Sequence, residues 1–100
     1  MLYNITSIQE FNELAKKNKP IVLYFTAKWC GPCKSLHPLI DKYKDIIDIC
    51  VVDIDSSNDL SSCFDVTSIP RLLMFKSGSK VDDITGANGQ KIVNSFNKIL

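Results

Sequence analysis

The sequence lacks the features by which membrane, secreted and nucleic-acid-binding proteins are recognised. Its longest apolar runs, such as residues 21–25 and 72–75, are far too short to span a bilayer. Neither sign of charge is in excess, because 12 Lys and Arg residues oppose 11 Asp and Glu residues. The start of the chain has neither the basic segment nor the apolar stretch of a signal peptide. We therefore expect a cytoplasmic protein with no membrane or nucleic-acid partner, unless a leader has been removed.

What the sequence does contain is typical of a small globular domain. A chain of 100 residues has no room for two cores, yet folding buries roughly 60–70% of its unfolded surface. Hydrophobic residues make up 45% of the chain and charged residues 23%, which is too apolar for a disordered protein. No repeat, linker or low-complexity stretch divides it. We predict a single domain over residues 1–100.

The cysteines Cys30, Cys33, Cys50 and Cys63 allow three kinds of chemistry. A disulfide scaffold is disfavoured because a chain this apolar can build a core without such cross-links. Zinc would need a second close pair, and Cys50 and Cys63 are too far apart to supply it, so we expect no metal site. There remains one Cys-x-x-Cys pair. In a chain without a secretory signal, this spacing near a β-α-β pattern indicates a dithiol redox centre.

Hydrophobic periodicity and turn residues predict an alternation of strands and helices. A capping box at Ser7 and Glu10, with Thr6 and Gln9 as the competing register, starts the first helix. Pro38 should kink the second helix. The expected strands are 2–5, 21–26, 46–54, 72–76 and 80–85, and the expected helices are 7–18, 33–44, 56–64 and one from residue 88 onward. This order favours an α/β fold, with a mixed central β-sheet of about five strands flanked by four helices.

The segment Trp29-Cys30-Gly31-Pro32-Cys33-Lys34 resembles the active site of the thioredoxin family. The similarity extends over nearly the whole chain, and its further motifs are Phe25-Thr26-Ala27, Pro38, Ser68-Ile69-Pro70, Phe75-Lys76-Ser77-Gly78 and Gly86-Ala87. A bare Cys-x-x-Cys is common, whereas this combination is specific. The resemblance implies the thioredoxin fold and a protein-disulfide reductase that serves cell redox homeostasis. It also implies no cofactor beyond a redox-active Cys30–Cys33 disulfide.

The order of attack by the two thiols follows from their positions. Cys30 lies at a predicted helix N-terminus, where free N–H groups and the helix dipole stabilise a thiolate. We expect Cys30 to be the exposed nucleophile and Cys33, one turn later, to be the shielded thiol that resolves the mixed disulfide. Gly31-Pro32 keeps the turn tight. We expect Trp29 to be a flat apolar wall beside the sulfur, rather than an ordinary core tryptophan.

The resemblance also implies a shallow groove that binds client proteins beside the dithiol. Ile69-Pro70 matches the family's cis-proline loop, for which an ordinary turn proline is the alternative. The backbone of Ile69 would pair with an extended client segment. Gly86 and Ala87 match a further rim of this groove. The expected client-binding residues are Trp29, Gly31, Pro32, Ile69, Pro70, Gly86 and Ala87.

Partners and competing functions are also implied by the resemblance. It implies a monomer recharged by an NADPH-dependent thioredoxin reductase, with clients such as peroxiredoxin, methionine sulfoxide reductase or ribonucleotide reductase. A second hypothesis is a binding module whose groove holds a partner while turnover is incidental. A third, an oxidant of the disulfide-isomerase kind, is disfavoured by Gly31-Pro32 between the cysteines and by the missing signal peptide.

Three positions depart from the family's pattern. Tyr24 stands where thioredoxins commonly bury an aspartate, and Val51 where many have a lysine, so both charged members of the usual proton relay are missing. Arg71 follows Pro70 where threonine is usual. These changes leave open how Cys33 loses its proton.

His37 is one candidate for that proton, because it lies four residues after Cys33 and shares its helix face. Imidazole has a pKa suited to proton transfer near neutral pH. His37 would act directly or through a water near Tyr24, with Arg71 stabilising the thiolate if its strand lies beside Tyr24. The favoured alternative is a solvated histidine with bulk water as the base.

The remaining cysteines have separate expected roles. Cys50 lies in a predicted buried strand and should behave as a small hydrophobic residue. Cys63 ends a short polar helix and is a candidate for glutathionylation or an intermolecular bridge. A Cys50–Cys63 disulfide is disfavoured in a reducing compartment.

Overall fold

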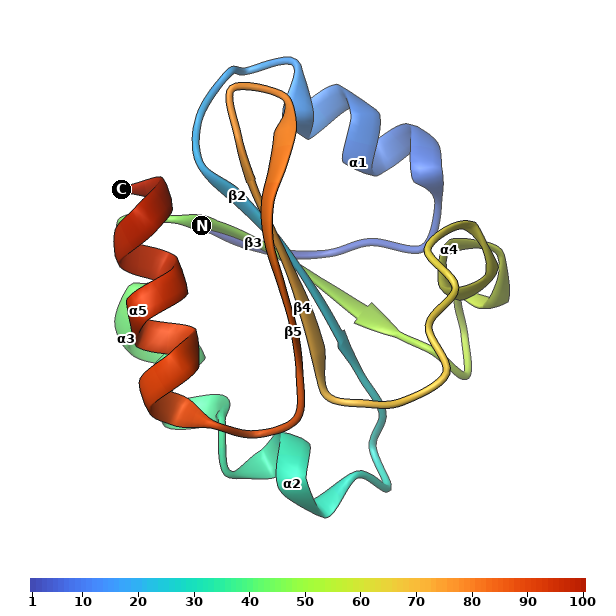
Figure 1. Cartoon of the computed structure of the whole chain (residues 1–100). Helices are drawn as coiled ribbons and strands as arrows, with labels where there is room; N and C mark the ends of the chain where they lie inside the picture. Colours follow the sequence, from blue (N-terminus) through green and yellow to red (C-terminus); the bar gives the residue numbers. More distant parts are fainter.

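A five-stranded mixed sheet in the order β1-β3-β2-β4-β5 organises the chain, and the computed structural model describes all of residues 1–100 (Figure 1). The strands are β1 (Leu2–Asn4), β2 (Ile21–Thr26), β3 (Asp48–Asp53), β4 (Arg71–Lys76) and β5 (Ser79–Thr85). The helices are α1 (Ile8–Ala15), α2 (Gly31–Lys34), α3 (His37–Tyr43), α4 (Asn58–Cys63) and α5 (Gly89–Ile99). Strands β1, β3 and β2 are parallel, and β4 and β5 form an antiparallel hairpin beside β2. The predicted mixed sheet with flanking helices is confirmed.

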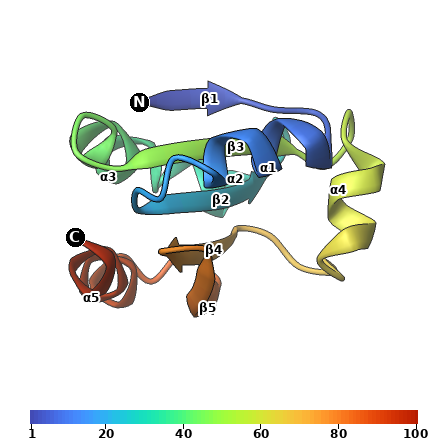
Figure 2. The ribbon, with the colours of Figure 1, turned by 90° about the horizontal axis from the view of Figure 1, so that it is seen from above.

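Two apolar layers sandwich the sheet, because alternate residues of its central strands point to opposite faces. Val22 and Tyr24 belong to the core under α3 and α5, whereas Leu23 and Phe25 belong to the core under α1 and α4. Figures 1 and 2 show these two helix pairs on opposite sides of the sheet. Central strand β2 is therefore apolar on both faces, as its near-continuous hydrophobic run predicted. None of the helices is both long and apolar enough to cross a membrane.

The predicted helix over residues 33–44 is wrong in one respect, because the chain forms two helices there. Helix α2 ends at Lys34, and α3 begins at His37 with Pro38 in its first turn. Pro38 has no N–H to donate to the carbonyl four residues earlier, so the helix is interrupted rather than merely kinked. The interruption leaves α2 as a single turn that carries the dithiol.

The ends of the other helices follow the capping signals. Ser7 Oγ accepts from the Glu10 N–H at 3.3 Å, which selects the Ser7 register, while the Glu10 carboxylate accepts from the Thr6 N–H at 3.1 Å. Helix α1 ends three residues earlier than predicted, and Asn18 then takes a left-handed backbone conformation. Helix α5 begins close to its predicted start, and Asn88 is its N-cap residue, whose side-chain oxygen accepts from the Lys91 N–H at 3.1 Å.

Candidate functional site: a dithiol at the end of the central strand

The single-turn helix α2 starts just beyond the carboxyl end of β2 and presents Cys30 as its N-cap residue. Cys30 and Cys33 form a disulfide, with their Cα atoms 5.3 Å apart. The Cys33 backbone N–H donates to Cys30 Sγ at 3.1 Å. A backbone donor aimed at sulfur stabilises negative charge there once the disulfide is reduced. The geometry therefore favours Cys30 over Cys33 as the thiolate.

Both sulfurs are shielded in this disulfide form, which corrects the expectation of an exposed Cys30. Cys30 is 3% exposed and Cys33 is 1% exposed. They form a small cluster with Ala27, and the side chains of Ile54 and Ile69 pack against it. Access to the dithiol is therefore governed by these apolar neighbours.

Trp29 lies on the surface beside the dithiol, so the core-tryptophan alternative is wrong. It is 66% exposed, and its indole N–H donates to Asp55 Oδ2 at 2.8 Å. Asp55 is fixed in turn, because its backbone N–H donates to Asp53 Oδ1 at 2.9 Å. Asp55 was not predicted from the sequence; the available signal was its place just after β3, at the end of the sheet where β2 also ends.

The structure brings the predicted client-binding residues to the same end of the sheet. The Ile69–Pro70 peptide bond is cis, as predicted, and Ile69 packs on the cysteine cluster. The Gly86 N–H donates to the Pro70 carbonyl at 2.8 Å, and this bond joins the Gly86-Ala87 segment to the Ile69-Pro70 loop. Gly86 has a φ of 102°, a conformation that favours glycine. Ala87 follows it on the surface.

The remaining residues of the motif lie on the surface. Gly31, Pro32 and Lys34 are all exposed, and Lys34 occupies the last turn of α2. An added Cβ at Gly31 would meet no atom within 4 Å, so the space in front of the turn is open. The dithiol is thus covered by apolar side chains on its interior side, and the other residues of the motif are exposed to solvent.

Tyr24 supports the dithiol from inside the sheet. It is 2% exposed, and its hydroxyl donates to the Cys33 carbonyl at 3.1 Å. Burial raises the pKa of Tyr24, and a hydrogen bond with the Thr26 side chain lowers it by a smaller amount. The phenol is therefore a neutral donor at physiological pH and cannot serve as a base.

His37 lies near Tyr24 without reaching the thiols. Both residues line a cavity of about 270 Å³, together with Thr26 and Asp41. His37 is exposed, and no hydrogen bond joins it to Cys33. His37 also lines a second cavity, of about 370 Å³, together with Ala27 of the cysteine cluster, so two cavities connect this histidine to the surroundings of the site.

The strand of Arg71 lies beside that of Tyr24, but the Arg71 side chain points to the other face, which corrects the expectation that it stabilises the Cys33 thiolate. Leu72 shares the core layer of Tyr24, so the preceding residue points to the other face of the sheet. There the Arg71 guanidinium pairs with Asp83 at 2.7 Å and contacts the end of α4. Direct stabilisation of the thiolate by Arg71 is thus excluded by the geometry.

The other two cysteines differ sharply in environment. Cys50 is fully buried in β3, and burial, followed by the nearby Asp48 and Glu10 carboxylates, raises its pKa to about 12. Cys63 is exposed at the end of α4, and neither residue is part of a disulfide. No cluster of His, Cys, Asp and Glu side chains in the chain could hold a metal ion.

Comparisons with known proteins agree with this geometry. The family model described as Thioredoxin matches residues 3–98. Human thioredoxin is 36% identical over 106 residues, covering all of both chains. Thioredoxin-2 of Pyricularia oryzae is 36% identical over 94 residues, which cover 91% of this chain and 55% of that protein.

Solved structures show the same likeness. Thioredoxin of Fasciola hepatica has a TM-score of 0.90 at 28% identity, covering 98% of this chain and 99% of that chain. A further matching structure was solved in a study of the thiol resolving mechanism in yeast mitochondrial 1-Cys peroxiredoxin via glutathione/thioredoxin systems. Its TM-score is 0.86 at 32% identity, and the match covers 97% of this chain and 94% of that chain.

Proposed function

The chain belongs to the thioredoxin family and is a protein-disulfide reductase, and we propose that it works through a mixed disulfide recharged by thioredoxin reductase. In the first step, the Cys30 thiolate attacks one sulfur of a client disulfide. A Cys30–client S–S bond forms, and the second client sulfur leaves as a thiolate. The observation that carries this assignment is the Cys33 N–H donated to Cys30 Sγ at 3.1 Å.

In the second step, the Cys33 thiolate attacks Cys30 Sγ and displaces the remaining client sulfur. The client has then gained two electrons and two protons, and the Cys30–Cys33 disulfide has formed. Thioredoxin reductase returns the protein to the dithiol with two electrons from NADPH. The Cα atoms of the two cysteines lie 5.3 Å apart, and this closeness supports the intramolecular step.

Resolution requires that Cys33 lose its proton, and we infer that water in the cavity beside Tyr24 carries it. Tyr24 itself keeps its proton because burial raises its pKa. His37 lines the same cavity without a bond to Cys33, which supports transfer through water over direct transfer to the ring. If His37 takes part, His37→Ala should slow resolution about tenfold, which is below the ~10²–10⁴ typical of general-base catalysis, and shift its pH profile. Unchanged resolution would make bulk water the base.

The clients, oligomeric state and location of this reductase are part of the proposal. We propose peroxiredoxin, methionine sulfoxide reductase or ribonucleotide reductase as clients, with the protein acting as a cytoplasmic monomer. The structural match from work on a peroxiredoxin's thiol resolution supports the first of these clients. No cofactor is needed for the exchange, because the two thiols hold both electrons.

The decisive experiment traps the intermediate. Cys33→Ser removes the resolving thiol, so covalent client adducts through Cys30 should accumulate. Because Cys63 is also exposed, the trap is built together with Cys63→Ser. The matched control adds Cys30→Ser and should give no adducts. If the trap gives none where the wild type reduces insulin, the two-step mechanism is wrong, whereas partner binding that survives loss of both active-site thiols would favour the binding-module hypothesis.

A further inference from the structure

Arg71, the residue after Pro70, has a side chain that links three parts of the fold. Its Nε and Nη2 donate to the two carboxylate oxygens of Asp83 on β5, at 3.0 and 2.7 Å. Its Nη1 donates to the carbonyls of Phe64 and Asp65, at 3.0 and 3.1 Å. The side chain is only 18% exposed, so these bonds are partly sheltered from water. A planar guanidinium can make all of them at once.

The two carbonyls lie at the carboxyl end of α4. Phe64 is the C-cap residue of that helix, and Asp65 follows it with a left-handed φ of 52°. Carbonyls in this position lack partners within the helix, and a cation there is favourable. The ring of Phe64 is itself fixed, because it packs against Phe11 and Phe25. Arg71 is therefore attached to a rigid part of the core.

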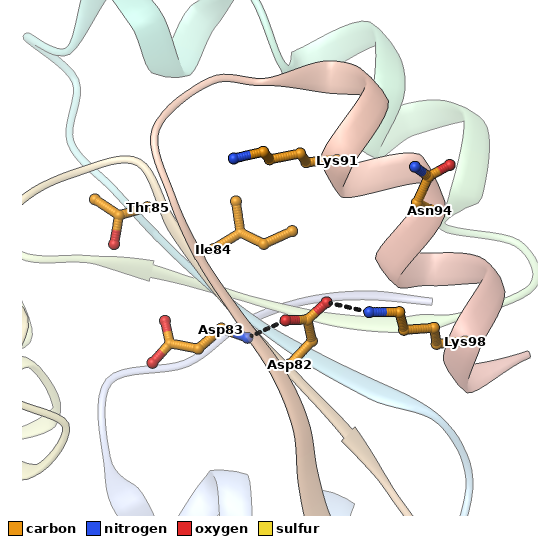
Figure 3. A pocket seen from close by; sticks show the side chains of 7 residues that line it. All are labelled: Asp82, Asp83, Ile84, Thr85, Lys91, Asn94 and Lys98. Carbon is orange, nitrogen blue, oxygen red and sulfur yellow. Dashed lines mark hydrogen bonds and ion pairs between the residues drawn. The ribbon is translucent and has the colours of Figure 1, made fainter.

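The neighbouring carboxylates Asp82 and Asp83 bind different parts of the fold. Asp82 accepts from Ser95 and Lys98 of α5, at 2.8 and 3.3 Å. In Figure 3 the Asp83 side chain points away from Lys98, toward the other side of β5. The only other cation paired with Asp83 is Lys80, at a longer distance of 3.5 Å. Arg71 thus provides the short, two-pronged contact to this carboxylate.

We propose that Arg71 is a positioning residue for client binding, whose side chain closes residues 64–70 into a loop of fixed shape and so holds the Ile69 backbone against the dithiol. The guanidinium binds the start of this segment, and its own backbone follows the end. A closed, fixed loop loses less freedom when a client segment pairs with it. The inference rests on the client-binding role of Ile69, which is part of the proposed function.

Two variants and one control test this inference in insulin reduction coupled to thioredoxin reductase. Arg71→Lys keeps the charge, but its three donors cannot replace the four bonds that the guanidinium makes to Asp83 and the two carbonyls. We expect its KM for insulin to rise about tenfold with kcat changed less than about twofold, because a mispositioned contact weakens client binding. Asp83→Asn should raise KM in the same direction. Lys80→Ala, which leaves every Arg71 bond in place, should match the wild type.

A small aromatic disulfide separates positioning from chemistry, since it offers no extended segment for Ile69 to bind. The ratio of insulin reduction to small-disulfide reduction should fall in Arg71→Lys and Asp83→Asn. Equal losses with both substrates, or a KM for insulin within about twofold of the wild type in both variants, would overturn the role of Arg71. Failure of the wild type itself to reduce insulin would instead contradict the proposed function.

Discussion

Replacing Tyr24 by phenylalanine removes one hydroxyl and so tests how much the Tyr24–Cys33 hydrogen bond stabilises the fold. The variant keeps the buried ring and removes only the hydroxyl that donates to the Cys33 carbonyl at 3.1 Å. That carbonyl is not left without a partner, because it also accepts from the Leu36 N–H at 3.0 Å. The expected cost is thus the net value of one hydrogen bond, about 1 kcal/mol, without the larger penalty of an unpaired buried group. The melting temperature should fall by roughly 4–8 °C.

Urea unfolding of the oxidised protein, followed by far-UV circular dichroism, measures this loss. The midpoint should move while the slope stays constant, since the surface exposed on unfolding is the same. Tyr43→Phe is the matched control: Tyr43 is also buried, and its hydroxyl makes no hydrogen bond within the protein. A loss below about 0.3 kcal/mol in Tyr24→Phe, or an equal loss in the control, would refute the reasoning.

The pH dependence of stability, compared between the wild type and Tyr24→Phe, tests whether the phenol is buried. Burial raises the pKa of Tyr24 above its ordinary value of 10.0. A group with a raised pKa in the folded state contributes its stability fully below the unfolded pKa and loses it as pH rises through the folded pKa. The wild type should therefore lose stability relative to Tyr24→Phe above pH 10 and not below it. A constant difference across that range would contradict the burial of the phenol.

Three further predictions concern the thiols and the first helix. When the protein is reduced and alkylated at neutral pH, mass spectrometry should find Cys30 modified first; earlier labelling of Cys33 or Cys63 would contradict the assignment of the nucleophile. In the oxidised protein, a thiol reagent at pH 8 should modify Cys63 but not Cys50, whose pKa burial raises to about 12, until urea unfolds the chain. Ser7→Ala should cost about 1 kcal/mol in urea unfolding because it removes the side-chain N-cap of α1, and an unchanged midpoint would show that the Ser7 hydroxyl does not stabilise the helix.

The parts of the fold that the sequence predicted are those with a local signal. The bounds of β2 match because its hydrophobic run is flanked by Pro20 and by the cysteine motif. The positions of β4 and β5 and the start of α5 also follow from residues adjacent in sequence. Pro38 marked the right place, but a missing N–H occurs in both kinked and interrupted helices, so the sequence alone did not distinguish the two.

The contacts that the sequence missed join distant segments or depend on the face of a strand. Trp29 and Asp55 are 26 residues apart, and no periodicity connects an indole to a carboxylate at that separation. Arg71 was misplaced for a different reason. Strands β2 and β4 are apolar on both faces, so they show no alternation of polar and apolar residues that would reveal which way each side chain points.

The observed direction of the Arg71 side chain shows that two of the departures from the family's pattern, Tyr24 and Arg71, act in separate places. Tyr24 and Arg71 lie on the adjacent strands β2 and β4 but point to opposite faces of the sheet. Tyr24 acts on the backbone of Cys33, whereas the Arg71 side chain contacts α4 and β5. Because they share no partner, a change at one should leave the bonds of the other intact. Under the proposed mechanism, a change at Tyr24 should therefore affect the support of Cys33 and leave client binding unchanged, whereas a change at Arg71 should affect client binding and leave the Tyr24–Cys33 bond intact.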